Sequence, residues 1–170
     1  MKAAMKATMK TLTRLLMVAC LVLPFAACKK AEAPVAEVKA PMSAPTTDDR
    51  QAWSDYLQDI VPRHMGGIVN QPYVYLLPGE SAPDFQDQYD RLLEKTTQDV
   101  GRGIVEGNML AYGGPASAKV ADMIVASFKD VPPGTMKGVR VLFIGKAADN
   151  ERVKAAVTPA GVDYVFVETK

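Results

Sequence analysis

The pattern of apolar and polar residues divides the chain after residue 47 into alternating helices and strands. Apolar side chains first recur every three to four residues over 53–61, which predicts a helix that a Thr47-Asp48 cap begins and Pro62 disrupts. A continuous apolar run at 73–77 then predicts a buried strand. The full predicted order is helix 53–61, strand 73–77, helix 81–100, strand 109–112, a helix after Pro115 that reaches Phe128, strand 139–144, helix 148–157 and strand 163–167.

The ends of the predicted helices carry recognisable signals. Ser81 and Asp84 have the spacing of a capping box, which places the start of the second helix at Ser81. Gly101 and Gly103 end this helix, and Pro115 suits the first turn of the next one.

The predicted elements indicate an α/β fold. Strands that alternate with helices and read as continuous apolar runs are typical of a mostly parallel sheet with both faces covered. Right-handed crossovers would then complete a three-layer domain with a small four-stranded sheet over residues 48–170, which is long enough for one core. A ferredoxin-like α+β arrangement is the alternative, because the sequence of so small a sheet leaves the strand order open.

The first 27 residues have a different composition and predict an export signal. No acidic residue precedes Cys28, and the apolar run at 15–27 follows four basic residues, Lys2, Lys6, Lys10 and Arg14. This run is shorter than the roughly 20 apolar residues that a membrane-spanning helix needs. We therefore interpret 1–27 as a signal peptide and not as an anchor in itself.

Ala26 and Ala27 directly before Cys28 resemble the lipobox of bacterial lipoprotein precursors. The resemblance implies cleavage before Cys28, diacylation of this cysteine, and a membrane that holds the protein through the lipid. Lys29 favours the outer membrane, because lipoproteins retained in the inner membrane of some bacteria resemble a pattern with aspartate there. Two alternatives are a second lipobox at Cys20, and ordinary cleavage after 31–33, which would give a soluble periplasmic or secreted protein.

Residues 28–47 predict a tether between the lipidated Cys28 and the domain. The segment contains Pro34, Pro41 and Pro45 among small residues, and it has no helical or strand periodicity.

Charge and residue counts exclude several classes of function. Four of the 20 basic residues precede Cys28, which leaves 16 against 19 acidic residues and a net charge of about −3 for the processed chain. This balance argues against a nucleic-acid partner. Both cysteines also precede residue 29, so the domain has no disulfide or thiol nucleophile. His64 is the only histidine, and the chain lacks both the P-loop and the dinucleotide fingerprint, so we predict neither a metal nor a cofactor.

A candidate ligand site lies in the loops that would follow the strands. Ligands of parallel sheets approach the carboxyl ends of the strands. There Gly113 and Gly114 allow close backbone approach, Ser117 offers a hydroxyl near a helix start, and Lys146 supplies a positive charge from the next loop. These four residues are the predicted anion site, although a tight turn between strand and helix is the favoured explanation of Gly-Gly-Pro.

Three functions follow as hypotheses. The first is a membrane-tethered envelope lipoprotein whose noncatalytic domain binds a protein partner or serves as an accessory of an envelope assembly. The second is a small-ligand or anion-binding domain that uses the Gly113–Ser117 loop. The third is an envelope hydrolase, which would require His64 to meet a carboxylate pair or one of the serines Ser81, Ser117 and Ser127.

Overall fold

A parallel sheet of four strands forms the centre of the structure, a computed structural model that describes residues 40–170. The unit to which these residues belong begins at Lys39. Its elements are α2 (Arg50–Arg63), β1 (Tyr73–Leu76), α3 (Phe85–Gly101), β2 (Met109–Gly113), α4 (Ser117–Phe128), β3 (Arg140–Gly145), α5 (Ala147–Val157), the 3₁₀ helix η1 (Thr158–Ala160) and β4 (Asp163–Glu168).

The strands lie in the order β1-β2-β3-β4, and each pairs in parallel with the next. Tyr75 is opposite Tyr112 in the first pair, and Phe143 is opposite Phe166 in the last. The predicted parallel α/β fold is therefore confirmed, and the ferredoxin-like alternative is wrong. Of the described elements, only η1 was not predicted.

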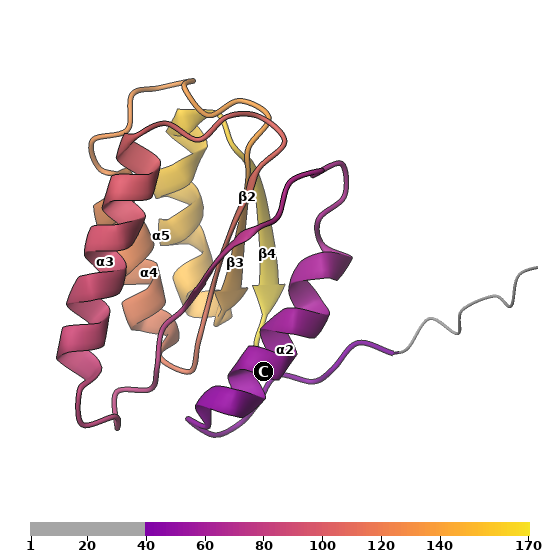
Figure 1. The fold of residues 1–170 in the computed structure, drawn as a ribbon, viewed down its shortest axis with the longest axis vertical. Coiled ribbons are helices and arrows are strands. Elements are labelled where there is room, and N and C mark those ends of the chain that lie inside the picture. Colours follow the sequence, from indigo (N-terminus) through magenta and orange to yellow (C-terminus); the bar gives the residue numbers. More distant parts are fainter. Residues whose placement is uncertain (1–39) are drawn as a thin grey trace, which may run out of the picture. The chain divides into compact units, whose positions relative to one another are not determined.

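The strand order decides how the helices cover the sheet. When parallel strands follow one another in sequence order, right-handed crossovers place every connecting helix on the same face. Accordingly α3, α4 and α5 lie together on one face and α2 lies on the other (Figure 1). Neighbouring residues of β2 show the division, because Leu110 and Tyr112 pack in the α3–α5 core whereas Met109 and Ala111 pack in the α2 core.

Among the described residues, a single helix covers the α2 core. Trp53, Leu57 and Ile60 extend from α2 over buried side chains of β2 and β3, as their helical spacing predicts. Leu142 and Ile144 are the β3 side chains beneath them, and both are fully buried. This face of the sheet therefore depends on one helix, whereas the opposite face has three.

One strand prediction needs correction, because β1 is an edge strand. Its continuous apolar run predicts burial, and Tyr75 is indeed buried, but Tyr73 and Val74 are exposed. The apolar character of a strand indicates that apolar surroundings cover it. Which strand lies at the edge depends instead on the strand order, which the strand's own sequence does not reveal. β1 has no neighbour on its outer side within the described chain.

Two predicted caps are also wrong. The cap of α2 is Asp49, whose carboxylate accepts a 2.7 Å hydrogen bond from the backbone N–H of Ala52. α3 begins at Phe85 without a side-chain cap, and the hydroxyl of Ser81 donates instead to Asp48. A competing acceptor that lies 33 residues away in the chain therefore replaces the local capping box.

Residues 40–47, the described part of the predicted tether, lie against α2. The backbone N–H of Met42 donates to Asp59, and the indole N–H of Trp53 donates to the carbonyl oxygen of Thr47 at 2.8 Å. The signal peptide, the lipobox cysteine Cys28 and the rest of the tether lie outside the described residues. Over residues 40–170, no helix is both long and apolar enough to cross a bilayer.

Candidate functional site

Both glycines of the predicted anion site have a role in packing. Gly113 ends β2, where a Cβ would lie 2.9 Å from the Leu57 side chain of α2. Gly114 has a φ of +152°, and a Cβ there would lie 2.1 Å from the carbonyl oxygen of Leu77. The close approach of the chain after β1 thus requires glycine at position 114, and the Leu57 side chain packs closely against Gly113. The turn explanation accounts for them without a ligand.

Ser117 joins the loops after β2 and β3. Its hydroxyl donates to the Asp149 carboxylate at 2.7 Å and accepts a 2.8 Å hydrogen bond from the backbone N–H of Lys146. Asp149 also accepts two hydrogen bonds from the guanidinium of Arg152. The structure therefore brings Ser117 and Lys146 together as predicted, but a carboxylate of the protein already occupies the hydroxyl that an anion would need.

The position of Asp149 favours its charged form. Burial opposes ionisation, but hydrogen bonds from Ser117 and Arg152 outweigh it and hold the pKa of Asp149 below its ordinary value. Asp149 also lies in the first turn of α5, where the helix dipole favours a negative charge. An added phosphate or carboxylate would meet this charge at short range.

We expect an Asp149→Asn substitution to lower the free energy of unfolding at pH 7 by about 1–3 kcal/mol, because it removes a charged acceptor. Since the folded pKa lies below the unfolded one, this contribution is present above the unfolded value of roughly 3.9 and is lost as the pH falls through the folded pKa. Urea unfolding at pH 7, 5, 4 and 3 should therefore show the variant and the natural protein converging in acid. Asp130→Asn, at an exposed site, is the control. A stability difference that stays constant with pH would contradict the prediction.

A hollow at the carboxyl end of the sheet contains only one of the four predicted site residues. Its volume is about 360 Å³, and Lys146 and Lys170 supply its positive charges. Pro115 and Trp53 form part of the wall together with residues 45–48 and Thr169. Gly113, Gly114 and Ser117 do not line it.

The strand order also lacks the feature that usually creates a ligand site at the carboxyl end of a parallel sheet. In open α/β sheets, the binding crevice opens where the strand order reverses and the adjacent loops diverge to opposite faces. The order β1-β2-β3-β4 has no such reversal. The loops after β1, β2 and β3 all lead to helices on the same face of the sheet.

The serine and histidine side chains that a catalytic triad would require do not meet within residues 40–170. Nδ1 of His64 lies 2.9 Å from the carbonyl oxygen of Ile60, which places the ring at the end of α2. The candidate serine hydroxyls donate to Asp48, Asp149 and the Ile124 carbonyl, respectively from Ser81, Ser117 and Ser127. No Ser–His hydrogen bond forms within residues 40–170. The same part of the chain holds no cluster of three or more potential metal ligands.

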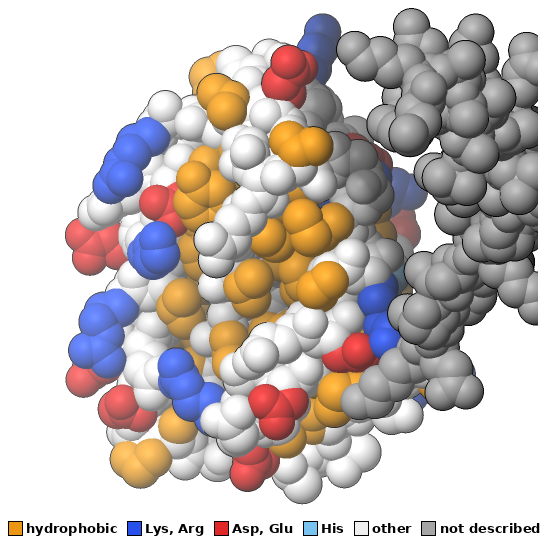
Figure 2. Space-filling view, turned by 45° about the vertical axis from the view of Figure 1, so that its right-hand side comes forward, with side chains coloured by type: hydrophobic (Ala, Val, Ile, Leu, Met, Phe, Trp, Pro, Cys, Tyr) orange, Lys and Arg blue, Asp and Glu red, His pale blue; other side chains and the backbone are white. Residues whose placement is uncertain are grey.

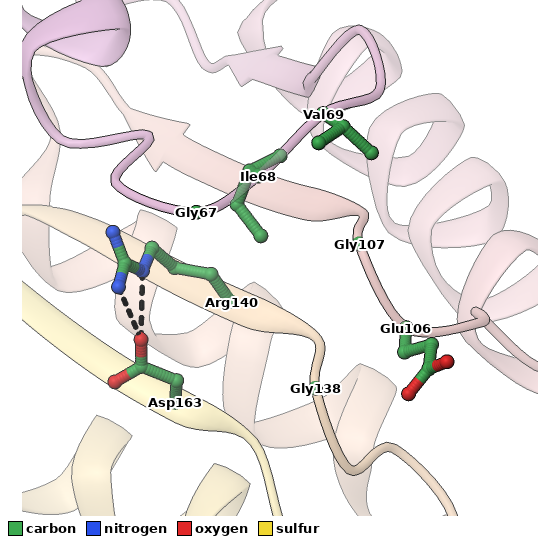
Figure 3. A pocket seen from close by; sticks show the side chains of 8 residues that line it. All are labelled: Gly67, Ile68, Val69, Glu106, Gly107, Gly138, Arg140 and Asp163. Atoms are coloured by element: carbon green, nitrogen blue, oxygen red, sulfur yellow. Dashed lines mark hydrogen bonds and ion pairs between the residues drawn. The ribbon is translucent and has the colours of Figure 1, made fainter.

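A larger hollow lies at the opposite, amino end of the strands (Figure 3). Its volume is about 430 Å³, and three glycines line it together with Ile68 and Val69. On one side Arg140 forms an ion pair with Asp163, and Glu106 lies apart from this pair. Arg140 also donates to the carbonyl oxygen of His64, so its charge is fully engaged by the fold. The glycines lining this crevice are Gly67, Gly107 and Gly138.

An apolar surface adjoins this crevice. Six large hydrophobic side chains are exposed over residues 40–170, and four of them lie on β1 or in the loops at its amino end. We call these four the β1 surface: Val69 (83% exposed), Tyr73 (40%), Val74 (47%) and Val105 (69%). Backbone hydrogen bonds from Val69 and Asn70 to the carbonyl oxygen of Gly107 hold the two loops together. On the face shown in Figure 2, hydrophobic side chains gather at the centre and charged ones lie mainly around them.

The sequence contains a signal for this surface that periodicity does not capture. Residues 66–79 form a stretch of 14 residues without a charged side chain, and β1 lies inside it. A strand in the middle of a sheet would need no charges, but an exposed edge strand usually carries them. The bonds from Ser117 to Asp149 and from Arg140 to His64 have no comparable signal in the sequence, because the two residues of each pair lie far apart in the chain.

Comparisons with known proteins assign no family to this arrangement. No family model, no curated protein and no solved structure matches the chain. Any function must therefore be argued from the residues themselves.

Proposed function

We propose that this protein is an envelope lipoprotein, held at a membrane by a lipid on Cys28, whose α/β domain binds a protein partner without catalysis. Two independent features support the proposal. The basic and apolar leader with Ala26-Ala27-Cys28 resembles a lipoprotein signal. The domain also combines an apolar surface with serine and histidine side chains that the fold itself engages.

The β1 surface is the observation that carries partner binding. Exposed apolar side chains that gather in one region of a domain are a feature of interaction sites. Val69 and Val105 extend from neighbouring loops, and both are more than half exposed. Burial of such side chains gains about 25 cal/mol per Å² of apolar area, which gives a partner a reason to bind here.

The lipid anchor is tested by metabolic labelling with a clickable fatty acid. We expect label on the natural protein and none on Cys28→Ala, because the acyl chains attach through the cysteine sulfur and the new amino terminus. Cys20→Ala is the matched control and should keep the label. If Cys28→Ala is labelled as strongly as the natural protein, the attachment lies elsewhere and the proposed anchor is wrong.

Partner binding is tested by photo-crosslinking in cells. We expect a crosslinking amino acid at Val74 to give a discrete adduct, and the same group at Val125 on α4 to give none. Both valines are exposed, so the comparison separates a specific surface from general stickiness. Adducts of equal yield from both positions would count against a binding surface at β1.

Anion binding is a second candidate, favoured by Lys146 and Lys170 at the carboxyl-end hollow. A phosphate at about 100 times its dissociation constant should add about 2.7 kcal/mol to stability, visible as a higher midpoint of thermal unfolding. Lys146→Ala should abolish this shift, and Lys137→Ala, an exposed control, should not. Gly114 is unsuitable as a control because its substitution disturbs the backbone itself. An equal shift in both lysine variants would remove the hollow as the site.

A further inference from the structure

We propose that a hollow between the carboxyl ends of α3 and α4 binds a small organic cation, an ammonium group carried on an apolar body. The volume of this hollow is about 320 Å³, which is the size of a small-ligand pocket. It shares no lining residue with the β1 surface or with the hollows at the two ends of the sheet. The site is therefore separate from the partner surface and does not depend on it.

The fold holds the walls of this hollow in place. α3 and α4 lie side by side, and the last turns of both helices line it (Figure 1). The loop after α4 supplies the third wall. Two backbone hydrogen bonds of 2.9 Å, from Gly134 to Pro159 and from Met136 to Ala160, fix this loop on η1. Because the walls are already ordered, a ligand would lose little binding free energy in forming the site.

The base of the hollow is apolar. Val100 and Met136 line it, and both are almost fully buried in the α3–α5 core. Val131 and Pro132 lie beside them in the loop after α4. An apolar ligand body that covers these side chains gains free energy in proportion to the area that it removes from water.

The polar groups of the wall favour a hydrogen-bond donor. Ser127 is only 5% exposed, and its hydroxyl donates to a carbonyl oxygen of α4 at 3.0 Å, which leaves its own oxygen as an acceptor. The hydroxyl of Thr135 also donates within its own turn, at 2.8 Å. Asp130 contributes a carboxylate, which makes no ion pair within residues 40–170. An ammonium group has three donors and no acceptor, so it matches these side chains.

The charges around the hollow also favour a cation. The carboxyl end of a helix carries a partial negative charge, and neither α3 nor α4 has a basic residue in its last turn. Arg102 lines the hollow, but its guanidinium lies 4.0 Å from the Asp99 carboxylate and donates to the Gln98 side chain at 3.4 Å. Lys129 lines a neighbouring hollow and not this one. The two helix ends and Asp130 are therefore left to a ligand.

The test is a titration of the purified protein with phenethylammonium, followed by NMR of the methionine methyl groups. We expect the Met136 signal to shift with a dissociation constant of about 1–10 mM, as for a ligand of so few atoms. The Met109 signal should not shift, because Met109 is buried in the α2 core on the other face of the sheet. Hydrocinnamate, an anion with the same apolar body, should bind at least tenfold more weakly.

Charge variants identify the group that selects the cation. Asp130→Asn should weaken the binding of phenethylammonium several-fold, whereas Glu80→Gln, at an exposed acidic residue outside the hollow, should leave it unchanged. Arg102→Gln should not weaken it, since this substitution removes a positive charge from the wall. Circular dichroism of each variant verifies that it is folded.

Three results would overturn the proposal. One is a Met136 signal that stays in place at the highest soluble concentration of phenethylammonium. Another is equal binding of hydrocinnamate and phenethylammonium, which would mean that the hollow accepts any apolar body. The third is binding that Arg102→Gln abolishes and Asp130→Asn does not, because the site would then select an anion. Crosslinking at Val74 tests the partner surface separately, so failure of either proposal leaves the other standing.

Discussion

Replacement of Gly114 by alanine is expected to destabilise the domain by about 3–5 kcal/mol, a large effect for a single added methyl group. A Cβ at this position would lie 2.1 Å from the carbonyl oxygen of Leu77 and 3.1 Å from its carbonyl carbon. Both atoms belong to the backbone, so neither moves away as a flexible side chain would. The φ of +152° adds strain for any residue with a Cβ. Because a domain of this size is stable by only about 5–15 kcal/mol, much of the protein would unfold in mild urea.

The measurement for Gly114→Ala is urea unfolding followed by circular dichroism. Gly67→Ala is the matched control, because a Cβ at Gly67 would meet no atom within 4 Å. The control should change the free energy of unfolding by no more than about 0.5 kcal/mol. A Gly114→Ala protein as stable as this control would mean that the chain after β2 takes a different course from the one described.

The second large effect is expected from Leu57→Ala, at about 2–5 kcal/mol. Leu57 is only 3% exposed, and it packs from α2 on the Gly113 end of β2. Truncation would leave a cavity on the face of the sheet that α2 alone covers within residues 40–170. The conservative Leu57→Met should cost less than about 1.5 kcal/mol, since it keeps most of the volume. Urea unfolding of both variants checks the prediction, and equal losses would argue against tight packing at this position.

Local sequence patterns predicted the elements well because their cause is local. The spacing of Trp53, Leu57 and Ile60 fixes the buried stripe of α2 without reference to the sheet. The run 141–144 is apolar throughout because β3 lies between two neighbouring strands and under helices on both faces. In each case the side chains that define the element also face the core.

Long-range features were not predictable in the same way. The hydroxyl of Ser117 donates to Asp149, which lies 32 residues away in the chain, and the hydroxyl of Ser81 donates to Asp48, which lies 33 residues away. No local pattern encodes such pairs, since they exist only once the strands are in order. The edge position of β1 also follows from that order, and a continuous apolar run looks the same at an edge as in the centre. The predicted anion site depended on long-range side-chain pairs and on the strand order, neither of which the sequence reveals. This explains why only Lys146 of the four residues lines the hollow at the carboxyl end.

The single helix over one face of the sheet has a consequence for cooperativity. Trp53, the only tryptophan of the chain, lies in α2, so its fluorescence reports docking of this helix, whereas far-UV circular dichroism reports all the helices and the sheet together. α2 precedes β1 in the chain and is not a crossover between strands, so it is free to detach while the sheet and its three helices stay paired. Elements of this kind open at lower free energy than the whole molecule. The two probes should therefore give separate melting transitions, with the tryptophan signal changing first.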